Sequence, residues 1–182
     1  YCTVYPYQVN CSNIPSKLPL EVQNSVNDII SKLIDRLHLC DGLLHTQFLV
    51  DGGDVWLVEC MRRAPGDLFY RMVELSVNVD GMGLYVRPFL GMEIPEVPAV
   101  EQYRPIARHT ISVPKPIVFQ SFRVALESGE CLDVVPLKIS GNTLDEAPYD
   151  KLAIMFFCFE SKESLFEVAP QLAEKIDFKK FG

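Results

Sequence analysis

The sequence of 182 residues is acidic and moderately apolar, with a formal net charge of −7, 48% hydrophobic residues and 23% charged residues. This composition is typical of a folded globular chain rather than a disordered one, and an acidic chain without a basic stripe does not suit a nucleic-acid partner. No apolar run approaches the roughly 18–20 residues needed to cross a bilayer and no signal peptide is recognisable, so we also expect no membrane partner.

The length suits one domain or two small lobes. The six cysteines lie far apart and form no CxxC pair. Because several of them lie within apolar runs, we interpret them as reduced, buried side chains rather than as a disulfide framework or a zinc site. Reduced cysteines favour a cytoplasmic setting. The opening YCTVYPYQVN contains neither Met nor a helix start, which suggests a piece of a longer protein.

The first predicted element is a helix over residues 19–39. Pro19 suits the first helical position, and Gly42 lies just beyond the expected end. The apolar residues of one helical stripe are Val22, Val26, Ile29, Ile30, Leu33, Ile34 and Leu37. Such a stripe predicts a side that packs on a core.

Residues 43–50 and 55–60 are predicted to form a β-hairpin around the sequence DGGD. A two-residue loop would pair the two aspartates, whereas a three-residue loop would pair Val50 with Asp54 and use a glycine in a bulged turn. The two-residue loop would also bury a carboxylate among aromatic side chains, which is costly, so we expect the three-residue loop. One face then carries Leu44, Thr46, Phe48, Val50, Trp56, Val58 and Cys60, and the half-polar face carries His45, Gln47, Leu49, Val55, Leu57 and Glu59.

Two helices are predicted beyond the hairpin. Asp67 is a good N-cap for a helix that ends near Asn78. A second helical segment is expected over residues 82–90, closed by Gly91, and the proline-containing segment 93–103 is expected to be a connector.

The second half of the chain is predicted to be rich in strands. Apolar runs predict strands at residues 106–113, 117–126, 131–137 and 151–160. Ser161 is expected to cap a last helix that runs through Glu174, and Lys179-Lys180 is interpreted as a solvated tail. Together these elements predict an α+β fold, a mainly antiparallel β-sheet with packed helices.

One region of the chain resembles a known family. A helix, GLLHTQF, a short turn, VWLVECMRRAPGD and another helix closely resemble the C-terminal lobe of ATP-grasp ligases. These carboxylate–amine or carboxylate–thiol ligases include L-amino-acid ligase, biotin carboxylase and the carbamoyl-phosphate synthetase large chain. The resemblance implies a lobe core over residues 1–96, a strand-rich part of the same lobe over residues 97–182, and an upstream nucleotide-binding lobe that is absent from this chain.

The resemblance also implies a nucleotide and metal site on the half-polar face. Glu59 matches the family's metal ligand, Arg63 matches its catalytic and phosphate-binding arginine, and Leu49 matches the position beneath adenine. Gln47 stands where the family usually has an acid, and Met61 where it has Asn. An amide oxygen can still bind Mg²⁺, whereas a thioether is a poor ligand for a hard cation. The implied cofactor is Mg²⁺ or Mn²⁺, with ATP as co-substrate.

The residues of this region also allow simpler interpretations. Glu59 could form an ion pair with Arg62 or Arg63, and without the family pattern that interpretation would be preferred. We assign no role to His45 and expect Arg62 to face solvent, since neighbours on an extended segment point in opposite directions.

Three functions from different classes remain open. The first is an ATP-dependent ligase that activates a carboxylate as an acyl phosphate and joins it to an amine or similar nucleophile. Its partners would be ATP, the two substrates, the upstream lobes and, as one option, a second copy in a homodimer. The second is a degenerate ATP-grasp lobe that binds nucleotide or protein without catalysis. The third is an α+β domain whose polar face meets a protein. Arg108 and His109 are weaker candidates for substrate contact.

Overall fold

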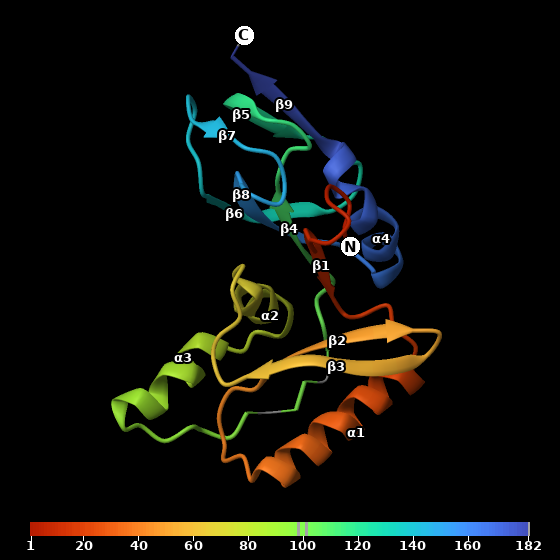
Figure 1. The fold of residues 1–182 in the computed structure, drawn as a ribbon, viewed down its shortest axis with the longest axis vertical. Coiled ribbons are helices and arrows are strands. Elements are labelled where there is room, and N and C mark those ends of the chain that lie inside the picture. Colours follow the sequence, from red (N-terminus) through yellow and green to blue (C-terminus); the bar gives the residue numbers. More distant parts are fainter. Residues whose placement is uncertain (98, 101, 182) are drawn as a thin grey trace. The chain divides into compact units, whose positions relative to one another are not determined.

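The computed structural model describes residues 1–97, 99–100 and 102–181 (Figure 1). They form two compact units. The sheet unit comprises Tyr1–Pro15, Asp67–Asn78 and Val100–Gly182, and the hairpin unit comprises Ser16–Gly66 and Val79–Ala99. The chain therefore leaves the sheet unit twice and returns twice, so these compact units cross the sequence division between residues 96 and 97.

The sheet unit is built on a four-stranded sheet in which all neighbours are antiparallel. The strand order is β1-β4-β8-β6. The bounds are β1 Cys11–Ile14, β4 Ile106–Ile111, β6 Glu130–Pro136 and β8 Ala153–Cys158. All six residues of β4 are buried, and so are five of the six residues of β8. A sheet with strands buried on both faces needs a covering layer on each side, because an uncovered face would expose apolar side chains to water.

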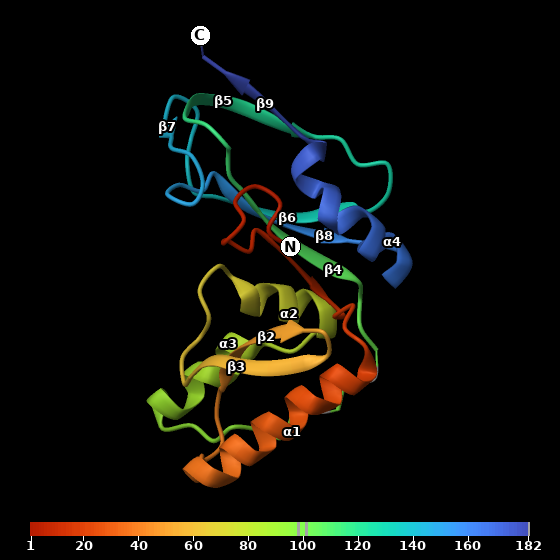
Figure 2. The ribbon, with the colours of Figure 1, turned by 45° about the vertical axis from the view of Figure 1, so that its right-hand side comes forward.

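The two faces of this sheet are covered by different elements, as Figure 2 shows. Helix α2, Phe69–Val77, covers one face, where its Met72 packs with Ile106 and Phe156. The other face is covered by the helix α4, Lys162–Val168, the 3-10 helix η2, Ala169–Lys175, and a second sheet. Buried apolar residues form one cluster on each side of the sheet, and the cluster on this second side is the larger.

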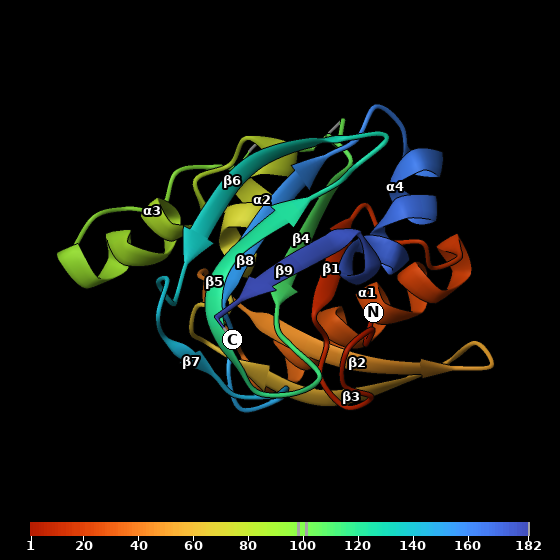
Figure 3. The same cartoon turned by 90° about the horizontal axis from the view of Figure 1, so that it is seen from above.

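The second sheet has three strands in the order β7-β5-β9. Their bounds are β5 Ile117–Val124, β7 Thr143–Leu144 and β9 Ile176–Lys180. Strands β5 and β9 run antiparallel side by side (Figure 3). Lys179 and Lys180 pair with Ser121 and Phe119 in this ladder. These lysines are exposed, as expected, but they belong to a strand and not to a tail.

The hairpin unit contains a long helix, a β-hairpin and a short helical segment. Its elements are α1 Leu20–Leu37, β2 His45–Asp51, β3 Asp54–Met61, α3 Gly81–Val86 and the 3-10 helix η1 Arg87–Leu90. Helix α1 packs against β3. Val22 is the one buried residue of α1, so most of the predicted apolar stripe is only partly covered.

Several predicted elements are confirmed, and their ends differ for identifiable reasons. Helix α1 ends as His38 adopts a left-handed conformation, and Gly91 closes η1 in the same way. Ser161 caps α4 by accepting a hydrogen bond of 3.1 Å from the Ser164 backbone N–H. The predicted last helix divides into α4 and η2. Strand β1 was not predicted, because its CSNI sequence carries no alternating pattern.

Two further predictions need correction. Asp67 is not the N-cap of α2, which begins at Phe69 after Leu68; instead Asp67 itself has a positive φ of 62°. The six cysteines are all free, as expected, but four of them are exposed rather than buried. In the described part of the chain, no helix has the length and apolar character that a membrane crossing requires.

Candidate functional site

The turn of the β2–β3 hairpin has two residues, not the expected three. Asp51 pairs with Asp54, so Gly52 and Gly53 form the loop. Their φ angles of 57° and 97° are both positive, which is the conformation of the type I′ turn that best matches the twist of a two-residue hairpin. The predicted pairing of Val50 with Asp54 is therefore wrong.

A β-bulge in β3 restores the polar pair that the shorter turn would have separated. Phe48 pairs with Leu57, but the next pair along the ladder is Gln47 with Glu59. Val58 is the extra residue, and an inserted residue of this kind shifts the alternation of side chains by one position. Gln47 and Glu59 therefore lie on the same face, as predicted, although the loop prediction that led there was wrong.

The remaining face assignments in the first half of β3 are reversed relative to the prediction. Leu49 pairs with Trp56, and these two side chains are 63% and 51% exposed. Val55 and Leu57 are the partly buried residues of this half. The open face of the hairpin thus combines Gln47 and Glu59 with an aliphatic and an aromatic side chain.

Glu59 has no hydrogen bond or ion pair with any described residue. The alternative in which Glu59 pairs with Arg62 or Arg63 is therefore wrong. Gln47 is likewise exposed, and its amide makes no hydrogen bond within the described part of the chain. The oxygen atoms of these two directly opposed side chains are therefore available to bind a ligand.

Arg62 holds the loop that follows α1. Its Nη1 donates to the Cys40 carbonyl at 2.9 Å and its Nη2 donates to the Asp41 carbonyl at 3.1 Å. Gly42 follows directly, with a φ of 139°, and a Cβ at this position would lie 2.5 Å from Arg62 Nη2. Arg62 is exposed, as expected, and its guanidinium also holds this loop in place.

Arg63 is exposed and makes one local contact, from Nη1 to the Ala64 carbonyl at 3.1 Å. The rest of its guanidinium fork has no partner among the described residues, so it is available for an anion. His45 lies opposite Met61 at the start of the hairpin. Its Nδ1 is buried and has no hydrogen-bond partner among the described residues.

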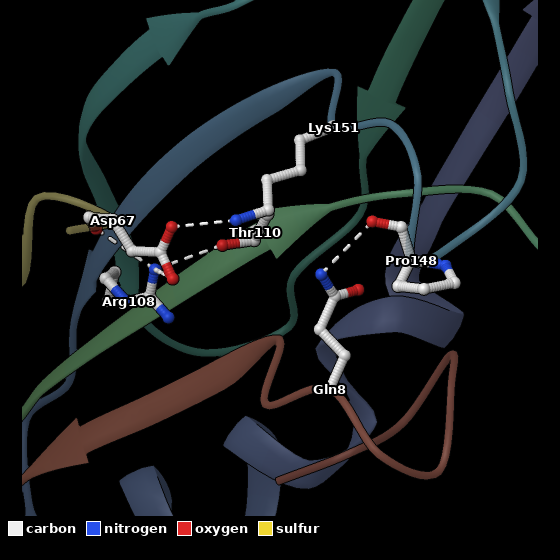
Figure 4. A network of polar contacts seen from close by, with 6 residues as sticks. All are labelled: Gln8, Asp67, Arg108, Thr110, Pro148 and Lys151. Atoms are coloured by element: carbon white, nitrogen blue, oxygen red, sulfur yellow. Dashed lines mark hydrogen bonds and ion pairs between the residues drawn. The ribbon is translucent and has the colours of Figure 1, made fainter. Parts of the chain in front are cut away.

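A separate polar network lies within the sheet unit (Figure 4). Lys151 Nζ donates to Asp67 Oδ1 at 2.8 Å, and the Arg108 side chain, 3% exposed, lies 3.8 Å from Asp67 Oδ2. Arg108 Nη1 also donates to the Asp67 carbonyl at 3.0 Å and to Thr110 Oγ1 at 3.1 Å. Burial lowers the pKa of Arg108, and the neighbouring Asp67 opposes this shift.

The sequence did not single out this network. Asp67 precedes Arg108 by 41 residues and Lys151 by 84, so no spacing rule could have joined them. Arg108 Nε remains buried and has no hydrogen-bond partner in the described part of the chain. A buried guanidinium held by a half-exposed carboxylate is first of all a structural requirement, because an unpaired buried charge is strongly unfavourable.

The open face of the hairpin fits a hard divalent cation in ligand type but supplies few ligands. Mg²⁺ prefers oxygen, and it is commonly held by one or two protein side chains together with phosphates and water. Glu59 and Gln47 offer one carboxylate and one amide oxygen. In the parts of the chain described, no group of three or more His, Cys, Asp or Glu side chains could hold a metal on its own.

Sequence comparison finds no match, since neither a family model nor a curated protein matches this sequence. The structure, in contrast, is similar to 149 chains of solved structures. L-amino acid ligase from Bacillus licheniformis superposes with a TM-score of 0.80 at 14% identity, over 97% of this chain and 45% of that one. Phosphoribosylglycinamide synthetase from Anaerococcus prevotii superposes with a TM-score of 0.75 at 9% identity, over 94% of this chain and 45% of that one.

A third similar structure is pyruvate carboxylase from Rhizobium etli, with a TM-score of 0.70 at 13% identity, over all of this chain and 19% of that one. These proteins are ATP-grasp enzymes. The chain therefore has an α+β fold of the ATP-grasp type, which confirms the fold expected from the sequence. It spans less than half the length of each of these solved chains.

Proposed function

We propose that this chain is the C-terminal lobe of an ATP-dependent ligase that activates a carboxylate as an acyl phosphate and joins it to an amine or similar nucleophile. The observation that carries the proposal is that Gln47 and Glu59 are opposed in the ladder on the open face of the hairpin, and that neither side chain has a partner among the described residues. The fold shared with ATP-grasp enzymes supports the same conclusion. Fold alone would not suffice, because one fold can serve many functions.

Each candidate residue has a distinct task in this proposal. Glu59 and Gln47 hold Mg²⁺ or Mn²⁺, which neutralises charge on the phosphates of ATP when it is bound. Leu49 gives the adenine an apolar surface. Arg63 is the catalytic residue, since its planar fork can contact the transferred phosphoryl group through two parallel hydrogen bonds. Phosphoryl transfer depends mainly on positioning and charge stabilisation, which these exposed side chains are suited to provide.

The remaining components belong to the intact protein. We propose that upstream lobes of the same polypeptide supply the other half of the nucleotide site, so that the 182-residue chain alone does not catalyse. A cytoplasmic setting and a homodimer also remain proposals.

A matched pair of variants in the intact protein tests the proposal. ADP release is measured with mixtures of amino acids and other small carboxylates and amines, as a function of Mg²⁺ concentration. Glu59→Gln should lower the rate by more than about 10-fold, since even groups that only support a metal ligand contribute about 10- to 100-fold. Asp54→Asn removes an exposed carboxylate from the same strand and should leave the rate unchanged. Equal effects of both variants would contradict the proposed role of Glu59.

The second candidate function is a degenerate lobe that binds nucleotide or protein without turnover, and Gln47 and Met61 favour it. Gln47→Glu distinguishes the two because it adds the charge that the family usually has at this position. In a working ligase, this variant should lower the Mg²⁺ concentration needed for half-maximal ADP release. ATP binding that is indifferent to Mg²⁺, without ADP release in either the wild type or Gln47→Glu, would establish the degenerate lobe.

A further inference from the structure

The sheet unit contains a pocket that has no part in the proposed nucleotide site. Its volume is about 250 Å³, and its walls come from the N-terminal segment, the end of β4, η2 and β9. The residues on which the argument depends are Thr3, His109, Ser112, Glu174, Ile176 and Phe178. None of the residues proposed to bind ATP or metal lines it.

Two buried polar side chains in the wall of this pocket lack hydrogen-bond partners. His109 is 1% exposed and Ser112 is 6% exposed. Neither His109 Nδ1 nor Ser112 Oγ has a partner within the described residues. Leaving a buried polar atom unpaired is unfavourable, and most such atoms in folded proteins are paired with protein, water or ligand. Both groups line the same pocket, which can therefore supply the missing partner.

The imidazole of His109 is neutral near pH 7. Burial lowers the pKa of His109 to about 4, and the neighbouring Arg108 guanidinium adds to this shift. Arg108 itself is directed to the opposite face of the sheet, because successive side chains of a strand alternate. A neutral imidazole has one nitrogen that donates and one that accepts.

Cys11 lies directly opposite His109 in the β1–β4 ladder, a combination of residue types found in nucleophilic sites. Burial raises the pKa of Cys11 to about 11, so the thiol is protonated at neutral pH. A reactive cysteine needs a lowered pKa and access to solvent, whereas Cys11 is fully buried. His109 lines the pocket and Cys11 does not, so the two residues are strand neighbours and not a catalytic dyad.

The charge of the pocket selects against anions. Among the described lining residues, Glu174 is the one charged side chain, and it is exposed at the pocket surface. The apolar part of the wall includes Ile176 and the aromatic ring of Phe178. Arg108 and the N-terminal ammonium are close enough to lower the pKa of His109, but neither lines the pocket. At the lining itself a carboxylate or phosphate would meet a negative charge, whereas a cationic or neutral donor would meet a carboxylate, a hydroxyl and an imidazole.

We propose that this pocket binds a small amine or nitrogen heterocycle with an apolar body, whose N–H groups satisfy Glu174, His109 and Ser112. The volume lies just below the range of about 300–1,000 Å³ typical of drug-sized ligand pockets, so the ligand is smaller than a nucleotide. This ligand differs in charge class from ATP and from a carboxylate substrate. The inference does not depend on the proposed ligase activity.

The test is an NMR titration of the protein with benzylamine, with benzoate as the probe of opposite charge. Benzylamine should give saturable shifts in residues 109–112 and 174–178, and benzoate should not. Ser112→Ala removes the hydroxyl with little change of volume and should weaken benzylamine binding by about 5-fold, the value of one hydrogen bond. Glu174→Gln should weaken it by about 3-fold, as for an exposed ion pair.

Glu167→Gln is the matched control, because Glu167 is an exposed carboxylate on α4 that does not line the pocket. It should leave benzylamine binding unchanged. The proposal is overturned if benzylamine gives no saturable shifts at millimolar concentration, or if benzoate binds equally well. It is also overturned if Ser112→Ala and Glu174→Gln bind benzylamine as the wild type does, which would mean that benzylamine binds without using the hydroxyl or the carboxylate.

Discussion

At the scale of single residues, burial decides what the titratable groups of the sheet unit can do. Arg108 and His109 are neighbours on β4, and both are almost fully buried. Arg108 keeps its charge because Asp67 and Thr110 satisfy part of its guanidinium. His109 has no such partner among the residues that the structure describes, and it loses its charge instead. Desolvation therefore acts on both residues, but only the histidine can respond by releasing a proton near neutral pH.

The lowered pKa of His109 predicts a loss of stability in mild acid. In the unfolded chain, the imidazole takes up a proton below about pH 6.5, whereas in the folded protein it stays neutral down to about pH 4. The unfolded state therefore binds more protons in this window, and the free energy of unfolding falls as the pH is lowered through it. At about 1.4 kcal/mol per pKa unit, the loss approaches about 3 kcal/mol.

Urea unfolding of the wild type and of His109→Gln between pH 7 and pH 4 measures this effect. His109→Gln should lose less stability over this range, because glutamine does not titrate. His38→Asn is the control, since His38 is exposed and has a left-handed conformation that asparagine tolerates. If His109→Gln shows the same pH dependence as the wild type, burial of His109 is not the cause.

At the scale of secondary-structure elements, the two-residue turn makes a prediction about its glycines. In a type I′ turn the first position accepts Asn, whereas the second strongly prefers Gly. Gly52→Asn should therefore leave the free energy of unfolding unchanged or raise it by up to about 1 kcal/mol, because asparagine restricts the unfolded chain. Gly53→Ala should lower it by about 1 kcal/mol or more, because φ at this position is 97°.

Chemical denaturation of the two variants distinguishes the observed turn from the three-residue alternative. That alternative requires a positive φ at Gly53 but not at Gly52, so Gly52→Asn would then gain nothing from the turn conformation. A loss of stability in Gly52→Asn comparable to that in Gly53→Ala would contradict the two-residue turn.

The hairpin also shows what could be read from the sequence. The strands, the turn region and the shared face of Gln47 and Glu59 were predictable from alternating polarity. The turn length was not, since DGGD is compatible with both loops, and the bulge at Val58 leaves no mark in the pattern of residue types. The wrong turn length and the missed bulge cancel at Glu59, whose predicted face is correct. They do not cancel at Trp56, which was assigned to the core face and is half exposed. The roles of Gln47, Leu49, Glu59 and Arg63 remain predictions.

At the scale of the whole molecule, buried apolar residues are distributed very unequally. Every residue of both core clusters belongs to the sheet unit. In the described part of the hairpin unit, Val22 is the one buried hydrophobic residue. The same unit exposes Leu20, Leu37, Leu49, Trp56, Phe89 and Leu90 by half or more. The sequence predicted the apolar stripe of α1 but not how little of it would be covered, because periodicity does not reveal the partner of a helix face.

This distribution predicts that the hairpin unit opens more readily than the sheet unit. Burial of apolar surface contributes about 25 cal/mol per Å², and regions with few buried contacts open at a lower free energy than the global unfolding. Hydrogen–deuterium exchange of this chain should therefore be faster at the amides of α1, β2 and β3 than at those of β4 and β8. Equal protection in the two sets would show that the hairpin unit has the stability of the core. Under the ligase proposal, the intact protein should protect β2 and β3 further, because the upstream lobe and ATP would cover Leu49 and Trp56.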